Sequence, residues 1–149
     1  MNEAAIPNSA LQRFSVLIGS WNTVGTHPYL PNTTLHGKAT FEWILGGAFL
    51  MMHTEIEEPE IPSGIAVFGS DDATGQYFML YFDERGVSRK YDISMQDDGL
   101  TWWRETSSFS QRCTISILDG GRRMVSNGAM SKDGGAWESD LHLTYTRQS

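Results

Sequence analysis

The side chains best suited to bind a ligand are polar residues that alternate with aromatic rings in the second half of the chain. Arg89 precedes Tyr91 on one face of a β-rich stretch, and Arg104 follows two tryptophans in the next. Small-molecule sites are typically lined by apolar and aromatic side chains, with a few polar groups that orient the ligand. The pattern therefore predicts a site for a ligand with an anionic or carbonyl group, and the candidate contacts are Tyr91, Trp103, Arg104, His142 and Tyr145.

The alternation of residues along these stretches does not decide which side chains point inward. Trp102 and Arg104 share one face of their stretch, Trp103 and Glu105 share the other, and both faces carry an aromatic ring. Each arginine could equally well form a cross-strand ion pair on the outer surface. The pattern leaves both assignments open.

Metal binding and nucleophilic catalysis have less support in the sequence. Cys113 alternates with Ile115 and Ile117, which is typical of a buried, unreactive thiol, and no Gly-x-Ser-x-Gly sequence is present. We predict no metal site, because the histidines have neither His-x-His nor His-x-x-x-His spacing. They lie on separate segments: His27, His36, His53 and His142. We assign no catalytic residue.

The overall charge excludes one large class of partners. The chain has a net charge of −7, and its eleven lysines and arginines form no basic stripe, so we expect no nucleic acid partner. No apolar run is long enough to span a membrane, and the first residues lack the basic and apolar regions of a signal peptide. We therefore expect a cytoplasmic protein, and a single cysteine is compatible with a reducing compartment.

The length of 149 residues predicts one domain over residues 1–149, with residues 1–8 as a loose tail. Asn8 or Ser9 can cap a short helix whose apolar residues share a face and close one end of the fold. These residues are Leu11, Phe14, Leu17 and Ile18. Gly19 and Trp21 then mark the change from helix to first strand, because glycine frees the backbone before a large buried ring.

About ten strand-like runs follow, and turns rich in glycine, proline or aspartate separate them. We expect them at 21–26, 34–44, 48–57, 65–70, 76–83, 87–95, 100–107, 112–118, 122–131 and 136–146. Turns of two to five residues cannot connect parallel strands, so the runs predict an antiparallel meander. A meander of this many strands hides its edges by closing. The predicted fold is an all-β, antiparallel up-and-down barrel with a short N-terminal helix at one end.

Three segments carry a resemblance to known proteins: the helical turn that runs into Gly19-x-Trp21, the hairpin at 43–50, and residues 69–86. Together they resemble the calycins, the lipocalin-like barrels that include fatty-acid-binding proteins, avidins and nitrobindins. The likeness is greatest to a bacterial lipocalin-like family of unknown function. It implies a barrel in which Trp21 packs at the closed end beneath an arginine or lysine of the last strand. Arg147 matches that position, and the alternative is a solvated residue near the C-terminus.

The resemblance to nitrobindins also implies haem as a cofactor to consider. The last strand resembles the nitrobindin end at 141–145, but the position of the iron-binding histidine falls on Asp140, a poor haem ligand. His142 has the same strand parity as Asp140, so a displaced ligand stays possible. The first strand departs from the family pattern, since residues 23–28 lack alternating glycines. We predict no cofactor and keep haem as an alternative.

The leading functional hypothesis is a non-enzymatic barrel that holds a small, largely apolar ligand, as a monomer or a homodimer. A second hypothesis is an enzyme that acts as an isomerase, cyclase or lyase on an enclosed hydrophobic substrate. It would need a buried carboxylate, such as Glu105, or a buried histidine, next to an arginine or tyrosine. Haem binding is a third hypothesis, and a filled barrel that acts through its outer surface is a fourth.

Overall fold

The computed structural model describes residues 8–148, so residues 1–7 of the expected tail lie outside the described part of the chain. Asn8, which the sequence assigned to that tail, is instead the cap of the first helix. Its side chain accepts a hydrogen bond from the backbone N–H of Ala10 at 3.0 Å. It also donates to the carbonyl of Ala48 at 3.1 Å. The cap therefore ties the start of the helix to the turn between the second and third strands.

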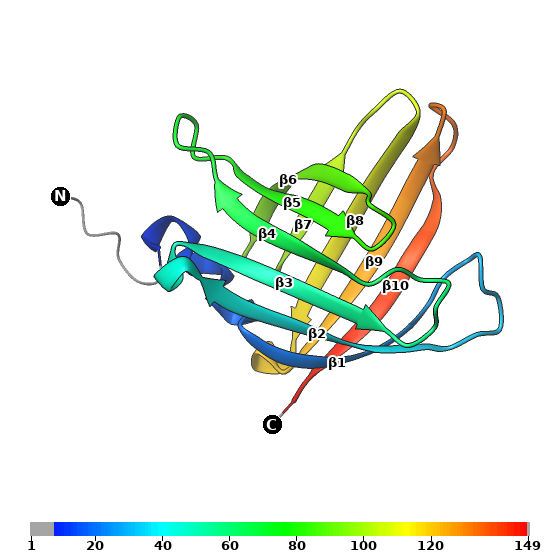
Figure 1. The fold of residues 1–149 in the computed structure, drawn as a ribbon, viewed down its shortest axis with the longest axis horizontal. Helices are drawn as coiled ribbons and strands as arrows, with labels where there is room; N and C mark the ends of the chain where they lie inside the picture. The colour runs from blue at the N-terminus through cyan, green and yellow to red at the C-terminus, as the bar shows by residue number, and fades with distance from the viewer. Residues whose placement is uncertain (1–7, 149) are drawn as a thin grey trace.

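Ten antiparallel strands form one closed barrel in which every strand pairs with its neighbours in sequence and β1 also pairs with β10 (Figure 1). The strands are β1 (Gly19–Thr26), β2 (Leu35–Ile44), β3 (Phe49–Ile56), β4 (Gly64–Ser70), β5 (Tyr77–Asp83), β6 (Ser88–Gln96), β7 (Gly99–Arg104), β8 (Phe109–Leu118), β9 (Arg123–Lys132) and β10 (Glu138–Arg147). The predicted all-β, up-and-down barrel is confirmed.

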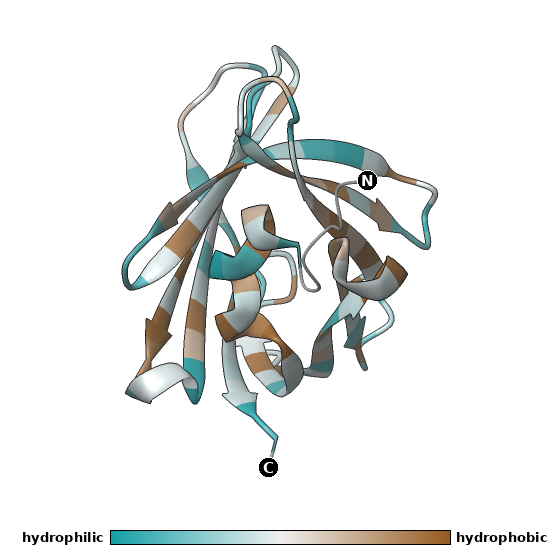
Figure 2. Ribbon diagram, turned by 90° about the vertical axis from the view of Figure 1, so that its left-hand side faces the viewer, coloured by the Kyte–Doolittle hydropathy of each residue, from teal (hydrophilic) through white to brown (hydrophobic). Residues whose placement is uncertain are grey.

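The N-terminal helix η1 (Ser9–Leu17) is a 3-10 helix that lies across one end of the barrel (Figures 1 and 2). A 3-10 helix has three residues per turn, so every third side chain falls on one line. Leu11, Phe14 and Leu17 have this spacing and are fully buried. Ile18, which we expected on the same face of the short helix, follows as the C-cap and is half-buried. No helix in the described chain is both long and apolar enough to cross a membrane.

The closed end of the barrel is filled by rings from the helix and the strands. The ring of Phe14 packs edge-on against Phe68 and Tyr77, with centroid distances of 5.4 Å and 5.0 Å. Trp21 is fully buried, and its indole N–H donates to the carbonyl of Leu17 at 2.9 Å. This bond satisfies one of the carbonyls that the end of a helix leaves free.

Arg147 connects the last strand to the same end. Its guanidinium carbon lies 4.1 Å from the centroid of the Trp21 ring, which is the stacking that the resemblance implied. The guanidinium also donates to the carbonyls of Val16 at 2.6 Å, Gly121 at 3.1 Å and Ile18. Gly19 has φ of +132°, and a Cβ at this position would lie 2.5 Å from the Arg147 side chain. Glycine is favoured here, because other residues rarely adopt this backbone conformation and their Cβ would displace the guanidinium.

A β-bulge interrupts the pairing of β10 with β9. Ser139 pairs with Ala129 and His142 with Asn127, so two residues of β10 stand opposite Gly128. The extra residue shifts the alternation of side chains along β10. An unbroken alternation would place Asp140 and His142 on one face, as the sequence predicts, and the bulge shows that this prediction is wrong.

Candidate functional site

A cavity of about 360 Å³ lies inside the barrel, towards the end away from η1. Its apolar wall includes three methionines, Trp102 and two leucines of β10: Met52, Met79, Met130, Trp102, Leu141 and Leu143. Its mouth is formed by the loops after β1 and β3, through Tyr29, Leu30, Glu60, Ile61 and Pro62. Methionine side chains are flexible and adapt to ligands of different shape.

A row of hydrogen-bonded polar groups crosses one side of this cavity. The hydroxyl of Tyr91 donates to Oε1 of Gln111 at 2.5 Å, and Nε2 of Gln111 donates to Asp140 at 3.0 Å. The other oxygen of Asp140 lies 3.1 Å from Nε2 of His27. The row runs from β6 through β8 and β10 to the end of β1. Each member has a partner, so the row is fixed in place before any ligand arrives.

The tautomer of His27 follows from its two contacts. The backbone N–H of Tyr29 donates to Nδ1 of His27 at 3.0 Å, and a backbone amide has no lone pair to offer in return. Nδ1 therefore carries no proton, and Nε2 carries the proton that it donates to Asp140. Both ring nitrogens are occupied, so this imidazole can act neither as a general base nor as a metal ligand in this arrangement.

Three residues at the mouth form a second polar group. The Asp83 carboxylate, whose side chain is fully buried, accepts from Arg85 Nη2 at 2.7 Å, from Arg85 Nε at 3.1 Å and from the Tyr81 hydroxyl at 2.7 Å. Mainly because of the bonds from Arg85, the pKa of Asp83 is lowered to about 2. Burial and the bond to Asp83 raise the pKa of Tyr81 well above its ordinary value.

Acid should weaken the fold through Asp83. Its folded pKa of about 2 lies below the ordinary value of 3.8, so the unfolded chain binds the proton first as the pH falls. The stabilisation is complete above about pH 4 and is lost towards pH 2. We expect a loss of about 1–2 kcal/mol, because Arg85 is half exposed and solvent screens the pair. Urea unfolding at several pH values from 5 to 2.5 should show a flatter profile for Asp83→Asn than for the wild type. Asp97→Asn, in an exposed turn, should keep the wild-type slope.

The structure brings together two of the five predicted ligand contacts, Tyr91 and Tyr145, both of which are buried and line the cavity. Trp102 lines the cavity in place of Trp103, since neighbours on a strand face opposite sides. Arg104 shares the inward face of Trp102 but lies beyond the cavity wall, at the end of β7. His142 alternates with the cavity residue Leu143 and so faces outward.

Three members of the polar row were not predicted as ligand contacts: His27, Gln111 and Asp140. A signal existed for Gln111, because it precedes Cys113 by two positions and therefore shares its face. Cys113 lines the cavity, and burial raises the pKa of its thiol to about 12. Asp140 was considered only as a replaced haem ligand. Nothing in the sequence marks His27, since its partner Asp140 lies 113 residues away.

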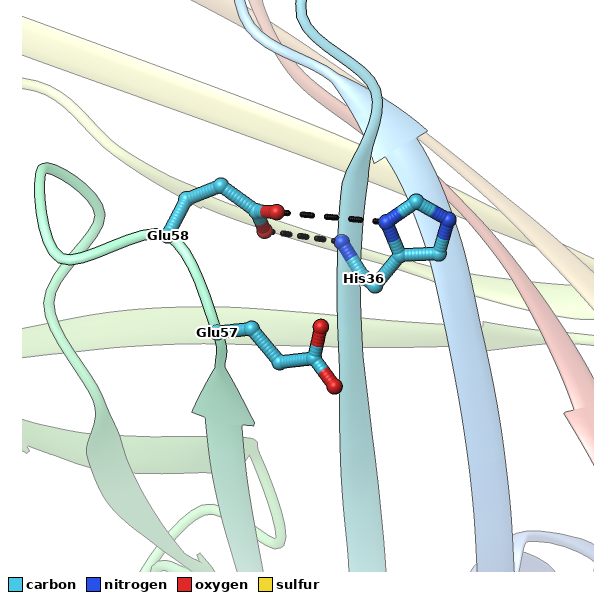
Figure 3. A group of neighbouring side chains, drawn as sticks. All are labelled: His36, Glu57 and Glu58. Atoms are coloured by element: carbon cyan, nitrogen blue, oxygen red, sulfur yellow. Dashed lines mark hydrogen bonds and ion pairs between the residues drawn. The ribbon is translucent and has the colours of Figure 1, made fainter.

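One group outside the cavity has the composition of a cation site. Ligand atoms of His36, Glu57 and Glu58 lie within 4.8 Å of one another, beside the start of β2 and the end of β3 (Figure 3). The backbone N–H of His36 donates to Glu58 at 2.8 Å, which lowers the pKa of that carboxyl. His36 and Glu57 are exposed, and hydrogen bonds within the group account for its geometry. Glu105, the carboxylate named for an enzyme, is also exposed and does not line the cavity.

Comparison with known proteins identifies the fold. No family model matches the sequence, and no curated protein matches it. Among solved structures, Rv2717c from M. tuberculosis has a TM-score of 0.66 at 16% identity, over 95% of this chain and 98% of that chain. The S-type phycobiliprotein lyase CPES from Guillardia theta has a TM-score of 0.65 at 11% identity, over 93% and 92% of the two chains. These likenesses show the barrel fold, and the ten-strand antiparallel barrel fits a calycin-like, lipocalin-type architecture.

Proposed function

We propose that this protein binds a small, largely apolar molecule inside the barrel. The observation that carries the proposal is the cavity of about 360 Å³ with an apolar wall on one side and a fixed polar row on the other. Ligand sites typically have volumes of about 300–1,000 Å³. A cavity near the lower end of this range fits a compact ligand or a single short chain.

Haem fits the residues of this cavity poorly. A haem site needs an axial ligand with a free lone pair. Both nitrogens of the cavity histidine His27 are occupied, and His142 faces outward from β10. Asp140, at the position that the resemblance gives to the ligand, already accepts three hydrogen bonds. We therefore propose a ligand that needs no axial imidazole.

The residues of the cavity also favour binding over catalysis. General acid–base catalysis needs a group that is free to exchange a proton with the substrate. The imidazole of His27 and the carboxylates of Asp140 and Asp83 are all engaged with other side chains or backbone groups. The thiol of Cys113 has a raised pKa and is a poor nucleophile near neutral pH.

Filling the cavity should abolish binding. Met79 is buried and lines the cavity, whereas its neighbour Leu80 faces outward and is 39% exposed. Met79→Trp places an indole in the ligand volume, and we expect it to weaken binding of the neutral naphthalene dye prodan by more than about tenfold. The measurement is a titration of dye fluorescence. Leu80→Trp is the matched control and should bind the dye as the wild type does.

The proposed function also predicts which tryptophan fluorescence the bound dye quenches. Trp102 touches the cavity and Trp103 does not, so bound prodan should quench the first more than the second. Quenching of tryptophan emission should therefore decrease in Trp102→Phe and persist in Trp103→Phe. Wild-type protein that binds no dye and carries no extra mass in native mass spectrometry would contradict the proposal. So would equal binding by Met79→Trp and Leu80→Trp.

A further inference from the structure

Two arginines at the open end of the barrel have no acidic partner. The chain has a net charge of −7, so carboxylates are abundant. Arg85 pairs with Asp83 there. Arg89 and Arg104 form no ion pair with any residue in the described range 8–148. Arg112 also lines the cavity and has no ion pair in this range, but its guanidinium stacks on the ring of Trp137 at 4.2 Å. Arg89 and Arg104 therefore have charge available for a ligand.

The strand register gathers these arginines around the polar row. Arg89 and Tyr91 lie two residues apart on β6 and so share its inward face. Arg104 pairs with Gln111 across β7 and β8, and the preceding residue of β7 pairs with Asp92 of β6. Arg104 therefore lies on β7 between Tyr91 and Gln111, and the hydrogen bond that joins these two side chains passes over it. Arg89 lines the cavity, and Arg104 lies just beyond the cavity wall, two residues after the lining residue Trp102 on the same face of β7.

Most of the donors of these two side chains are unused. Arg89 donates one hydrogen bond, from Nη1 to Oε1 of Gln111 at 2.9 Å, and its guanidinium carbon lies 5.3 Å from the centroid of the Phe109 ring. Arg104 donates none, and its Nε is the buried side-chain polar atom that lacks a partner within residues 8–148. A buried N–H without an acceptor destabilises the fold, and a charged one does so more strongly. An acceptor supplied by a ligand would remove this cost.

We propose that the ligand carries a carboxylate, which Arg89 and Arg104 bind beside the Tyr91 hydroxyl, while its apolar part enters the cavity among the methionines. This inference rests on the proposed function and adds the chemical class of the ligand. Burial raises the pKa of Tyr91, so its hydroxyl stays protonated and places no negative charge beside the carboxylate. Arginine suits this role, because its planar fork binds a carboxylate through two parallel hydrogen bonds.

The nearby acidic groups do not oppose such an anion. Asp140 lies across Gln111 from the arginines and is already compensated by hydrogen bonds from His27, Gln111 and the backbone of Leu141. Gln111 turns its carbonyl oxygen towards Arg89 and its amide nitrogen towards Asp140. Glu60, the other acid of the cavity lining, lies on an exposed loop where solvent screens its charge.

The test compares three ligands with one chain length and different head groups. Decanoate, decanol and decylammonium are each titrated against the wild-type protein with bound prodan, and displacement of the dye gives their affinities. We expect decanoate to bind at least about tenfold more tightly than decanol, as for charge-assisted hydrogen bonds to a half-buried cation. Decylammonium should bind more weakly than decanol.

Three charge variants test whether Arg89 and Arg104 cause the preference for decanoate over decanol. Arg89→Gln and Arg104→Gln should each reduce the preference for decanoate to less than about threefold, with the affinity for decanol nearly unchanged. Arg122→Gln removes one exposed positive charge elsewhere and should keep the full preference. Circular dichroism checks that each variant is folded, and Arg104→Lys should retain part of the preference if Arg104→Gln loses stability.

The outcomes separate this inference from the proposed function. Wild-type protein that binds decanol as tightly as decanoate overturns the carboxylate site and leaves the apolar cavity site intact. An equal loss of preference in Arg122→Gln and Arg104→Gln also overturns it, since the effect would then come from net charge alone. Protein that binds neither prodan nor any of the three decyl compounds contradicts the proposed function itself.

Discussion

Replacing Trp21 with alanine is expected to lower the free energy of unfolding by about 3–5 kcal/mol. The ring is fully buried, and three kinds of contact depend on it. Its N–H binds the carbonyl of Leu17, its edge packs against Tyr145 at a centroid distance of 6.4 Å, and its face supports the guanidinium of Arg147. Alanine would leave a cavity, one free carbonyl and a guanidinium without its stacking partner.

The measurement for Trp21 is equilibrium unfolding in urea. Trp137→Ala is the matched control, because Trp137 also lies beneath an arginine, at 4.2 Å from Arg112, but is 43% exposed. We expect the control to lose less than about 1 kcal/mol, since an exposed cation–π pair contributes little. A loss below about 1 kcal/mol in Trp21→Ala would mean that the ring does not organise the closed end.

The fold could be predicted from the sequence because turns and alternation are local signals. The expected hairpin turn at Leu45-Gly46-Gly47 forms a short 3-10 turn with Gly46 at φ of +67°, and Asp119-Gly120-Gly121 repeats it with Gly120 at +64°. Positive φ is the conformation for which glycine is favoured. Eight of the ten expected strands begin and end within two residues of the observed ones, and the other two are three residues off at one end. These differences arise because pairing with neighbours, and not local sequence, fixes where a strand stops.

The type of the first helix was harder to predict. Leu11, Phe14 and Leu17 fit the period of either a 3-10 helix or an α-helix, and only Ile18 distinguishes the two. In the structure the helix is a 3-10 helix, in which Leu11, Phe14 and Leu17 lie on one line and are buried. Local sequence gives no such preference, because tertiary contacts decide which backbone geometry buries the side chains best.

The candidate site was only partly predictable, since its polar row is built from distant segments. Tyr91 and Tyr145 could be found because they fit an unbroken alternation. Trp102 and Trp103 could not be told apart, because both faces of β7 carry a large ring. The bulge in β10 leaves no clear mark on that strand, yet it sets which way Asp140 and His142 point.

Two glycines on the neighbouring strands lie against the backbone of β10 at the bulge and beside it. A Cβ on Gly25 of β1 would lie 1.9 Å from the carbonyl oxygen of His142. A Cβ on Gly128 of β9 would lie 2.7 Å from the carbonyl oxygen of Leu141. The carbonyl of Leu141, in the bulge, and that of His142, the next residue, thus point at two glycines, one on each side. Glycine inside a strand often marks such a close approach of another backbone.

Gly25→Ala should therefore disturb both the fold and the site. The atom that the new methyl group meets belongs to the backbone of β10, so β10 must move, and we expect a loss of about 3 kcal/mol or more in the free energy of unfolding. Because Asp140 is held within the same bulge, its bonds to His27 and Gln111 should weaken as the strand shifts. Dye binding should then fall even in the fraction of protein that stays folded.

Urea unfolding and prodan titration of the same Gly25→Ala sample check both expectations. The control is Val24→Ala, an adjacent and outward-facing position on β1, which should cost less than about 1 kcal/mol and leave dye affinity unchanged. A Gly25→Ala variant as stable as the wild type would show that β1 and β10 can move apart at Gly25 without loss of stability. In that case the bulge would not hold Asp140 in the cavity wall through its neighbours, and the polar row would depend on side-chain bonds alone.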